Sequence, residues 1–218
     1  MKPKDLEVAR ACYAGEITMV DRWFGRLMER LESLGLLDRT AVIFTSDHGF
    51  YFGEHGMFGK ALMEERRFYG APLYEEVAKI PLLIFVPGMK PRRTSALVSV
   101  PDIAATVLDL SGVDIPDSFQ GRSLLPLLRG EPLPGRRTVV TTMPLYNPGE
   151  VTRVVDALER SVEEFLPATI TAGRWQLLYT KEGYPVELYD LKSDPEEKHN
   201  LAKRHPDVVA PPDVCQVP

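Results

Sequence analysis

The first third of the chain combines one long helical stripe with one short apolar run. Apolar side chains recur there at alternating intervals of four and three positions: Tyr13, Ile17, Val20, Phe24, Leu27, Leu31 and Leu34. This period predicts one amphipathic helix over residues 4–34, which Gly35 ends as a C-terminal cap. The run at residues 41–46 is β-branched and aromatic and looks buried on both faces, which favours a central parallel strand. A helix followed closely by such a strand indicates an α/β fold.

The middle of the chain predicts a functional loop, a second strand and a second helix. Residues 47–79 form a long connection rich in glycine and charge, and loops of this length in compact domains are typically functional or disordered. Residues 80–86 read as a second buried strand, with its proline tolerated at the strand start. Residues 99–110 read as a helix, because Ser99 and Asp102 resemble a capping box.

From about residue 136 the pattern changes to short strands joined by turns. Strands are predicted at 138–142, 168–171, 175–180 and 187–191, with Ala172-Gly173 as a hairpin turn. Residues 151–165 fit either a helix or a mobile insertion. Asp194 is predicted to cap a short helix that has Pro195 at its first position, and residues 205–209 look like the start of another helix. We therefore divide the chain into an α/β domain at 1–135 and a small α+β subdomain with antiparallel strands at 136–218.

Composition narrows the class of protein without identifying it. Of the 218 residues, 44% are hydrophobic and 26% are charged, as in ordinary globular domains. The sequence contains no run of 18 apolar residues, so it predicts no membrane-spanning helix. The net charge of -5 argues against a general nucleic-acid binder. Cys12 and Cys215 make neither a disulfide framework nor a zinc-binding pair. The first ten residues lack the apolar segment of a signal peptide, and the sequence predicts no compartment.

The sharpest candidate for chemistry is the tetrapeptide Ser46-Asp47-His48-Gly49, directly after the first predicted strand. Ligands of open α/β sheets bind beyond the carboxyl ends of strands, which is where Asp47 and His48 fall. A carboxylate beside an imidazole can bind a divalent cation. The alternative is that Asp47 caps a turn and His48 is a polar residue with satisfied hydrogen bonds.

The loop that follows offers a cation and a histidine. Glycines at positions 53, 56 and 59 let the backbone approach a ligand closely, and Lys60 would suit a tetrahedral anion such as sulfate or phosphate. The alternatives are an exposed surface lysine and, for His55, a structural hydrogen bond within the loop. The pair Arg136-Arg137 is predicted to be solvated surface, and the pair Glu75-Glu76 is predicted to lie on a helix surface or in loop packing. Neither the GxSxG motif of serine hydrolases nor a phosphate-binding GxxxxGK[ST] loop is present.

Several segments together resemble the C-terminal half of a sulfatase of the alkaline phosphatase superfamily. The segment TSDHGFYFGEHGMFGK is similar to the second metal-and-substrate motif of that family. The segments PLYEEVAKIPLLIFVPG, PDIAATVLDLSGVDIPDSFQGRSLLPLL and ELYDLKSDPEEKHNLA resemble later family motifs in the same order. The resemblance extends from about residue 10 to residue 205. It implies an alkaline-phosphatase-like sheet sandwiched by helices, with its N-terminal part incomplete.

The resemblance also implies roles for individual residues. Asp47 and His48 would be ligands of one divalent cation, for which calcium is favoured over manganese or magnesium. Lys60 would contact the oxyanion and the bridging oxygen of a small-molecule sulfate ester and so act in catalysis. We assign His55 to substrate binding together with Lys60.

One departure from the family limits what this chain does alone. The family makes its formylglycine nucleophile from Cys or Ser in a C/S-x-P-x-R motif, and neither Cys12 nor Cys215 lies in such a motif. We therefore expect the nucleophile in a missing N-terminal half and expect the isolated chain to be inactive. Two alternatives are a phosphonate monoester or phosphodiester hydrolase of the same superfamily, and a non-catalytic fragment that binds a metal or a complementary N-terminal chain.

Overall fold

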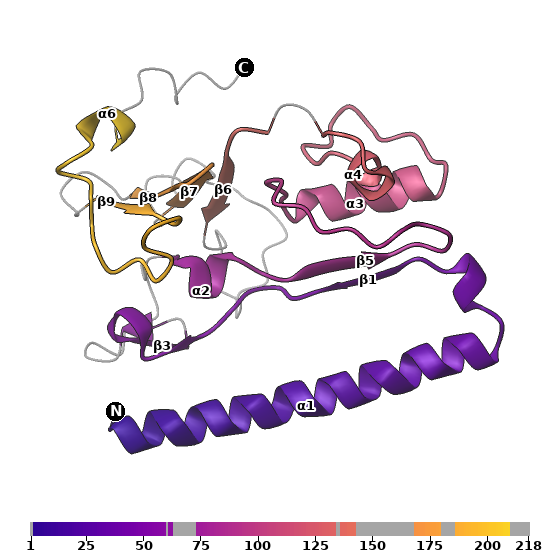
Figure 1. Ribbon diagram of the computed structural model, residues 1–218, viewed down its shortest axis with the longest axis horizontal. Coiled ribbons are helices and arrows are strands. Elements are labelled where there is room, and N and C mark those ends of the chain that lie inside the picture. Colours follow the sequence, from indigo (N-terminus) through magenta and orange to yellow (C-terminus); the bar gives the residue numbers. More distant parts are fainter. Residues whose placement is uncertain are drawn as a thin grey trace, which may run out of the picture.

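The computed structural model describes residues 2–59, 61–62, 73–133, 136–142, 168–179 and 186–209. A two-stranded sheet of β1 (Val42–Thr45) and β5 (Leu82–Phe85) has helix α1 (Pro3–Ser33) on one side (Figure 1). Helices α3 (Pro101–Leu110) and α4 (Leu125–Arg129) lie on the other side of this sheet (Figure 1). The predicted arrangement of a sheet between helices is therefore confirmed.

Helix α1 confirms the helix predicted from the apolar stripe. Its first turn is stabilised by Asp5, whose carboxylate accepts a hydrogen bond from the Lys2 backbone N–H at 2.9 Å. Gly35 ends the helix in the left-handed conformation, with φ of 63°. No side chain of α1 is buried, so the helix lacks the covering that its amphipathic pattern predicts.

The predicted pairing and burial of the first two strands are wrong. Strands β1 and β5 are antiparallel, with Phe44 opposite Leu83, and neither has a strand on its outer edge among the described residues. The described part of the connection between them contains short strands and short helical turns, whereas a parallel pair typically has a longer crossover helix. Phe44, Leu83 and Phe85 are exposed, so the apolar composition of these strands does not reflect burial within this chain.

Short elements fill the segment between β1 and β5. The described elements there are β2 (Tyr51–Phe52), the 3₁₀ turn η2 (Glu54–Gly56), β3 (Met57–Gly59), β4 (Ala61–Leu62) and α2 (Glu75–Ala78). Another 3₁₀ turn, η1 (Leu37–Arg39), connects α1 to β1. Strands β2, β3 and β4 pair antiparallel in that order. The described part of the predicted glycine-rich loop thus contains a three-stranded antiparallel sheet and a short helix.

Helix α3 begins at Pro101, two residues after the predicted start. The predicted capping interaction is half present, because the Asp102 carboxylate accepts a hydrogen bond from the Ser99 backbone N–H at 2.8 Å. The fixed φ of proline suits the first helical position, which is where Pro101 stands. The capping residue Ser99 therefore lies in the turn that precedes the helix.

The third sheet is a four-stranded antiparallel meander, which confirms the antiparallel strands predicted after residue 136. Its strands are β6 (Val139–Thr142), β7 (Ala168–Ala172), β8 (Trp175–Tyr179) and β9 (Glu187–Asp190). Gly173, with φ of 60°, turns the chain between β7 and β8, which confirms the predicted hairpin. Residues 151–165, predicted as a helix or an insertion, lie outside the described residues.

The segment after β9 is a series of turns, so the helix predicted to start at Asp194 is wrong. Asp194 caps a turn instead, since its carboxylate accepts the backbone N–H groups of Lys198 and His199. Glu197 has φ of 50°, which a continuing helix does not allow. The Glu197 side chain is buried. The helix predicted near residue 205 is present as α6 (Pro206–Val209).

The main buried cluster joins the segment between β1 and β5 to the β6–β9 sheet. It consists of Tyr51, Met57, Leu73, Tyr74, Val77, Leu178 and Tyr189. The Thr169 hydroxyl adds a buried hydrogen bond to the Leu73 carbonyl at 2.7 Å. None of the described helices is long and apolar enough to cross a membrane.

Candidate functional site

Asp47 and His48 lie in the turn that leaves β1, where the sequence places them. Two backbone hydrogen bonds attach this turn to α2: Gly49 N–H donates to the Val77 carbonyl at 3.0 Å, and Phe50 N–H donates to the Glu76 carbonyl at 3.1 Å. A Cβ atom on Gly49 would lie 1.8 Å from the Glu76 carbonyl oxygen. Glycine is therefore required at position 49, because any side chain would push the Asp47-His48 turn away from α2.

The side chains of Asp47 and His48 present two ligand atoms side by side. His48 Nδ1 lies 2.9 Å from the Gly49 carbonyl oxygen, and a carbonyl oxygen accepts, so this contact places a hydrogen on Nδ1. The other nitrogen, Nε2, lies 3.2 Å from Asp47 Oδ2. Either a second proton on the imidazole or a shared cation makes this approach favourable.

The geometry of this pair fits a divalent cation. Two adjacent ligands of an octahedral ion at about 2.3 Å, the short end of the calcium range, are about 3.3 Å apart, close to the observed separation. The Asp47 side chain is 82% exposed and that of His48 is 39% exposed, so the pair is open to solvent and to further ligands. Two ligand atoms are too few for a complete coordination sphere, and the rest must come from water, substrate or other residues.

The two remaining predicted site residues have different outcomes. Lys60 lies outside the described residues. His55 belongs to η2, and its ring stacks on that of Tyr74 with centroids 3.6 Å apart and an angle of 4° between the planes. His55 Nε2 lies 3.4 Å from Glu76 Oε2, and the His55 side chain is only 12% exposed.

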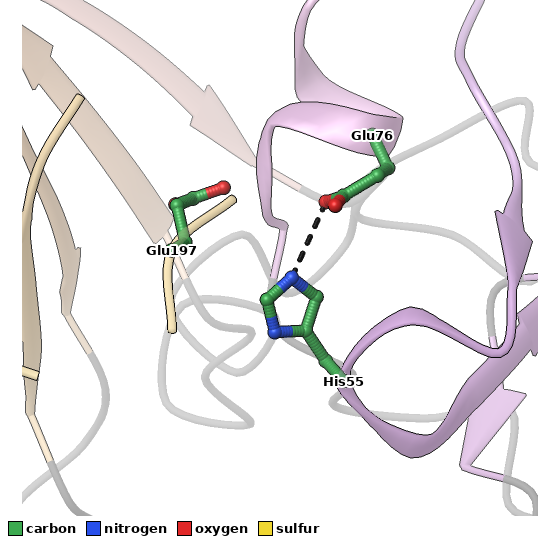
Figure 2. A group of neighbouring side chains, drawn as sticks. All are labelled: His55, Glu76 and Glu197. Atoms are coloured by element: carbon green, nitrogen blue, oxygen red, sulfur yellow. Dashed lines mark ion pairs between the residues drawn. The ribbon is translucent and has the colours of Figure 1, made fainter. Parts of the chain in front are cut away.

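His55 forms a three-residue cluster with two glutamates from distant parts of the chain. Glu76 comes from α2, and Glu197 comes from the turns after β9 (Figure 2). One ligand atom from each of the three residues lies within 4.8 Å of the others. His55 and Glu197, with φ of 54° and 50°, are the two non-glycine residues of positive φ within the described ranges. Such conformations are uncommon and persist where surrounding contacts impose them.

The three members of the cluster differ in how their polar atoms are satisfied. Glu197 is buried, and its carboxylate accepts hydrogen bonds from the Glu75 backbone N–H at 2.7 Å and from the Gln176 amide. His55 Nε2 and Glu76 Oε2 are buried without a hydrogen bond of good geometry, and they face each other (Figure 2). An ion pair or a shared cation would compensate for their loss of hydration.

Burial and neighbouring charges shift the protonation of this cluster. Burial, together with the charges of Glu76 and Glu75, raises the pKa of Glu197 to about 7. Burial lowers the pKa of His55, but the contact with Glu76 and the nearby carboxylates outweigh it, so that pKa is raised overall. Burial and the Glu187 carboxylate also raise the pKa of Tyr74, whose hydroxyl donates to that carboxylate at 2.7 Å.

Sequence reasoning missed the roles of Glu76 and Glu197. Glu76 was assigned to a helix surface or loop packing, and Glu197 to the first turn of a helix that does not form. Glu76 in α2 and Glu197 in the turns after β9 lie far apart in sequence and meet only through the fold, so no local spacing connects them. The left-handed conformation of Glu197 likewise has no signal in a sequence that reads as a capped helix.

Known proteins with similar sequences are sulfatases. A family model described as Sulfatase matches residues 2–113. Arylsulfatase K of Bos taurus is 31% identical over 210 residues, which make up 95% of this chain and 36% of that protein. The N-acetylglucosamine-6-O-sulfatase of Bacteroides thetaiotaomicron is 34% identical over 195 residues, or 87% of this chain and 31% of that protein. The chain thus spans about a third of the length of these curated relatives.

Known structures with similar folds are sulfatases and phosphonate hydrolases. A protein solved in complex with its substrate D-glucosamine-2-N,6-O-disulfate has a TM-score of 0.64 and 29% identity, covering 88% of this chain and 35% of its own. The phosphonate monoester hydrolase of Silicibacter pomeroyi has a TM-score of 0.75 and 28% identity, covering 96% of this chain and 40% of its own. The fold is therefore alkaline-phosphatase-like.

The family also bears on the metal. Membership in the sulfatase family implies a divalent cation. The cluster of His55, Glu76 and Glu197 is a possible group of metal ligands, in addition to the predicted ligand pair of Asp47 and His48. The order of motifs, the matched family model and the sequence identities agree. The chain belongs to the sulfatase family of the alkaline phosphatase superfamily.

Proposed function

We propose that this chain is part of a hydrolase of small-molecule sulfate esters. The observation that supports this most directly is the Asp47-His48 pair, with its ligand atoms 3.2 Å apart in a turn attached to α2. The sulfatase relatives favour sulfate as the anion. The complex with a glucosamine disulfate makes a sulfated sugar one substrate class to test.

We assign each predicted site residue a role in this reaction. Asp47 and His48 bind one divalent cation, which supplies positive charge beside the ester oxygens. The carboxylate favours calcium, and the imidazole would also suit manganese. Lys60 stabilises the charge that develops on the leaving oxygen, and His55 assists in substrate binding. His48 Nδ1 donates to the Gly49 carbonyl, which would leave Nε2 as the atom that holds the cation.

We further propose that the nucleophile is supplied from outside these 218 residues, as a formylglycine. Neither cysteine lies in a C/S-x-P-x-R motif, so the chain alone is expected to be inactive. The proposed division into residues 1–135 and 136–218 is compatible with the strand pairing of the described residues, in which the β1–β5 and β2–β3–β4 sheets precede the boundary and the β6–β9 sheet follows it.

The experiment compares the isolated chain with the polypeptide encoded by the longest reading frame that contains it. Both are purified and assayed with an aryl sulfate in the presence of calcium. We expect the longer polypeptide to hydrolyse the ester and the isolated chain to be inactive. In the longer polypeptide, Lys60→Ala should lower kcat by about 10²–10³-fold, as does the loss of one transition-state hydrogen-bond donor in other enzymes. An active isolated chain, or a longer polypeptide unaffected by Lys60→Ala, would overturn the proposal.

A second candidate function is the hydrolysis of phosphonate monoesters. It is favoured by the similarity to the Silicibacter pomeroyi enzyme, with its TM-score of 0.75. An aryl phosphonate monoester, assayed beside the aryl sulfate, separates the two functions by the ratio of kcat/KM values. A ratio above one for the phosphonate would reassign the activity without changing the residues proposed to carry it.

A further inference from the structure

Gly49 connects the imidazole of His48 to helix α2. The carbonyl oxygen of Gly49 lies 2.9 Å from His48 Nδ1, and the N–H group of Gly49 donates to a carbonyl of α2 at 3.0 Å. The N–H group of Phe50 donates to the preceding carbonyl of α2 at 3.1 Å. The orientation of the His48 ring, and with it the 3.2 Å separation of Nε2 from Asp47 Oδ2, therefore depends on where α2 lies.

Helix α2 is too short to hold that position by itself. It has four residues, all of them described, and of these only Val77 is buried. Isolated helices of this length are not stable in water. The side chain of its N-cap residue, Tyr74, donates to Glu187 on β9 at 2.7 Å rather than capping the helix. The position of α2 must therefore be set by other elements.

Glu197, from the turns after β9, supplies a hydrogen bond at the start of α2. Its carboxylate accepts the backbone N–H group of Glu75, the first residue of the helix, at 2.7 Å. The other carboxylate oxygen of Glu197 accepts the side-chain amide of Gln176 on β8. The Glu197 side chain is buried beside α2 (Figure 2). One buried carboxylate thus joins β8 to the first turn of α2.

The C-terminal sheet also holds the two residues that precede α2. The Thr169 hydroxyl on β7 donates to the Leu73 carbonyl at 2.7 Å, and the Tyr74 hydroxyl donates to Glu187 on β9. Together with Glu197, these contacts reach three successive residues, 73–75. Of the three contacts, the one from Glu197 is made to α2 itself. It is therefore the contact closest to the carbonyls that hold the turn of Asp47 and His48.

We propose that Glu197 is a positioning residue for the pair Asp47 and His48. By holding the first residue of α2, Glu197 fixes the place of Gly49, and Gly49 in turn orients the His48 ring. This inference rests on the proposed function, in which Asp47 and His48 bind the cation. It gives a residue of the C-terminal region a part in arranging ligands that follow β1.

The positioning role and a ligand role make different demands on the Glu197 side chain. A positioning role needs one oxygen that accepts the Glu75 N–H group, and an amide offers such an oxygen. A ligand role beside His55 and Glu76 needs the charge of the carboxylate. Both Glu197 oxygens already accept hydrogen bonds, from Glu75 and from Gln176, which favours the positioning role.

Four variants separate these roles. Glu197→Ala removes the acceptor, and Glu197→Gln keeps it. Glu196→Ala is the matched control, because Glu196 is the neighbouring glutamate and its side chain is 67% exposed. Thr169→Val removes the hydrogen bond to Leu73 at nearly constant volume, and it serves as a second, milder variant if Glu197→Ala does not fold.

Hydrogen exchange of the 218-residue chain, measured amide by amide with NMR, reports the two hydrogen bonds between the turn and α2. We expect Glu197→Ala to speed exchange at Gly49 and Phe50 by about tenfold or more relative to the amides of α3, since a buried donor loses its acceptor. Thr169→Val should speed the same two amides by a smaller factor. Glu197→Gln and Glu196→Ala should exchange like wild type.

A second control distinguishes positioning from a general loss of stability. Arg136→Ala removes the ion pair with Asp102 on α3. We expect it to speed exchange of the α3 amides at least as much as that of Gly49 and Phe50. The ratio of the two exchange rates therefore rises in Glu197→Ala and does not rise in Arg136→Ala.

Manganese(II), added alone, tests the ligand pair itself. Its unpaired electrons broaden the NMR signals of nearby nuclei, so the His48 ring signals report even weak binding. We expect equal broadening in wild type and Glu197→Gln at one manganese concentration. Glu197→Ala should need at least about ten times more manganese, as residues behind metal ligands typically change affinity by 10–100-fold. Asp47→Ala should abolish the broadening.

Three results would overturn the positioning role. The first is unchanged exchange of Gly49 and Phe50 in Glu197→Ala, or in Thr169→Val if the former does not fold. The second is acceleration that only matches that of the α3 amides. The third is a Glu197→Gln variant as impaired as Glu197→Ala, which would assign the carboxylate a ligand role. Absence of His48 broadening in wild type would instead contradict the proposed cation site, and amide exchange would still decide whether Glu197 holds the turn.

Discussion

Arg136 and Asp102 form a buried, two-pronged ion pair, with both guanidinium–carboxylate hydrogen bonds 2.7 Å long. The same carboxylate accepts backbone N–H groups from Ser99 and Arg122 at 2.8 Å each. The Asp102 side chain on α3 thus binds the segments that contain Ser99, Arg122 and Arg136. Arg136 is at the start of the region proposed as the C-terminal subdomain. The prediction that Arg136-Arg137 is a solvated surface pair is wrong for Arg136, whose side chain is 14% exposed.

Removal of this arginine should be costly. Arg136→Ala leaves the Asp102 carboxylate buried without its counter-charge, and we expect it to lower the free energy of unfolding by about 3–5 kcal/mol. Arg137→Ala is the matched control, because Arg137 is exposed, and its effect should stay within about 0.5 kcal/mol. Urea unfolding of both variants measures the difference. Equal midpoints for the two variants would show that Asp102 does not depend on Arg136.

Glycine at position 49 should be irreplaceable. Gly49→Ala places a Cβ atom 1.8 Å from the Glu76 carbonyl oxygen, and backbone cannot move away as a side chain can. We expect the turn that carries Asp47 and His48 to shift, with a loss of about 3 kcal/mol in stability. Gly15→Ala is the contrast, because nothing lies within 4 Å of its added methyl group. In the interior of α1 it should stabilise by about 0.5–1 kcal/mol. Thermal unfolding of both variants gives the comparison.

The stability of the chain should fall as the pH rises from about 5 to 8. Glu197 has a pKa raised from 4.5 to about 7, so the folded state binds its proton more tightly than the unfolded state. Its contribution is fully present below pH 4.5 and is lost as the pH passes 7. The raised pKa of His55 acts in the same direction above pH 6.5. The Glu197 contribution is about 3 kcal/mol at most, because each pKa unit corresponds to 1.36 kcal/mol.

A variant separates the Glu197 contribution from other pH effects. Glu197→Gln cannot ionise, so its urea midpoint should change less than the wild-type midpoint between pH 5 and pH 7. Glu131→Gln alters an exposed glutamate and should leave the wild-type pH profile unchanged. An identical pH profile for Glu197→Gln and wild type would show that Glu197 titrates normally in the folded chain.

Metal affinity should depend on Asp47. In the longer polypeptide, Asp47→Ala removes a proposed ligand, and we expect calcium affinity to fall by about a hundredfold or more, since even changes to residues behind the ligands cost 10–100-fold. Asp114→Ala, which removes an exposed aspartate after α3, should leave affinity unchanged. Isothermal titration calorimetry with calcium and with manganese measures both variants. Unchanged affinity in Asp47→Ala would direct attention to His55, Glu76 and Glu197 as the ligands instead.

The sequence by itself determined the elements whose signals are local. The apolar stripe and Gly35 define α1, the Ala172-Gly173 turn defines the β7–β8 hairpin, and the position of Asp47 and His48 follows from the strand before them. Each of these depends on residues within one turn or one strand. Propensity and periodicity act over that same range, so the prediction succeeded there.

Only the tertiary structure decided the pairing of distant groups. The antiparallel register of β1 and β5, the ion pair of Arg136 with Asp102, and the meeting of His55 with Glu197 all join segments that lie far apart in sequence. The tertiary structure also decided how exposed each side chain is, because an apolar strand is buried only if another element covers it. The apolar pattern of α1 and β1 indicates side chains that need to be covered. The fold of the described residues leaves many of these side chains exposed.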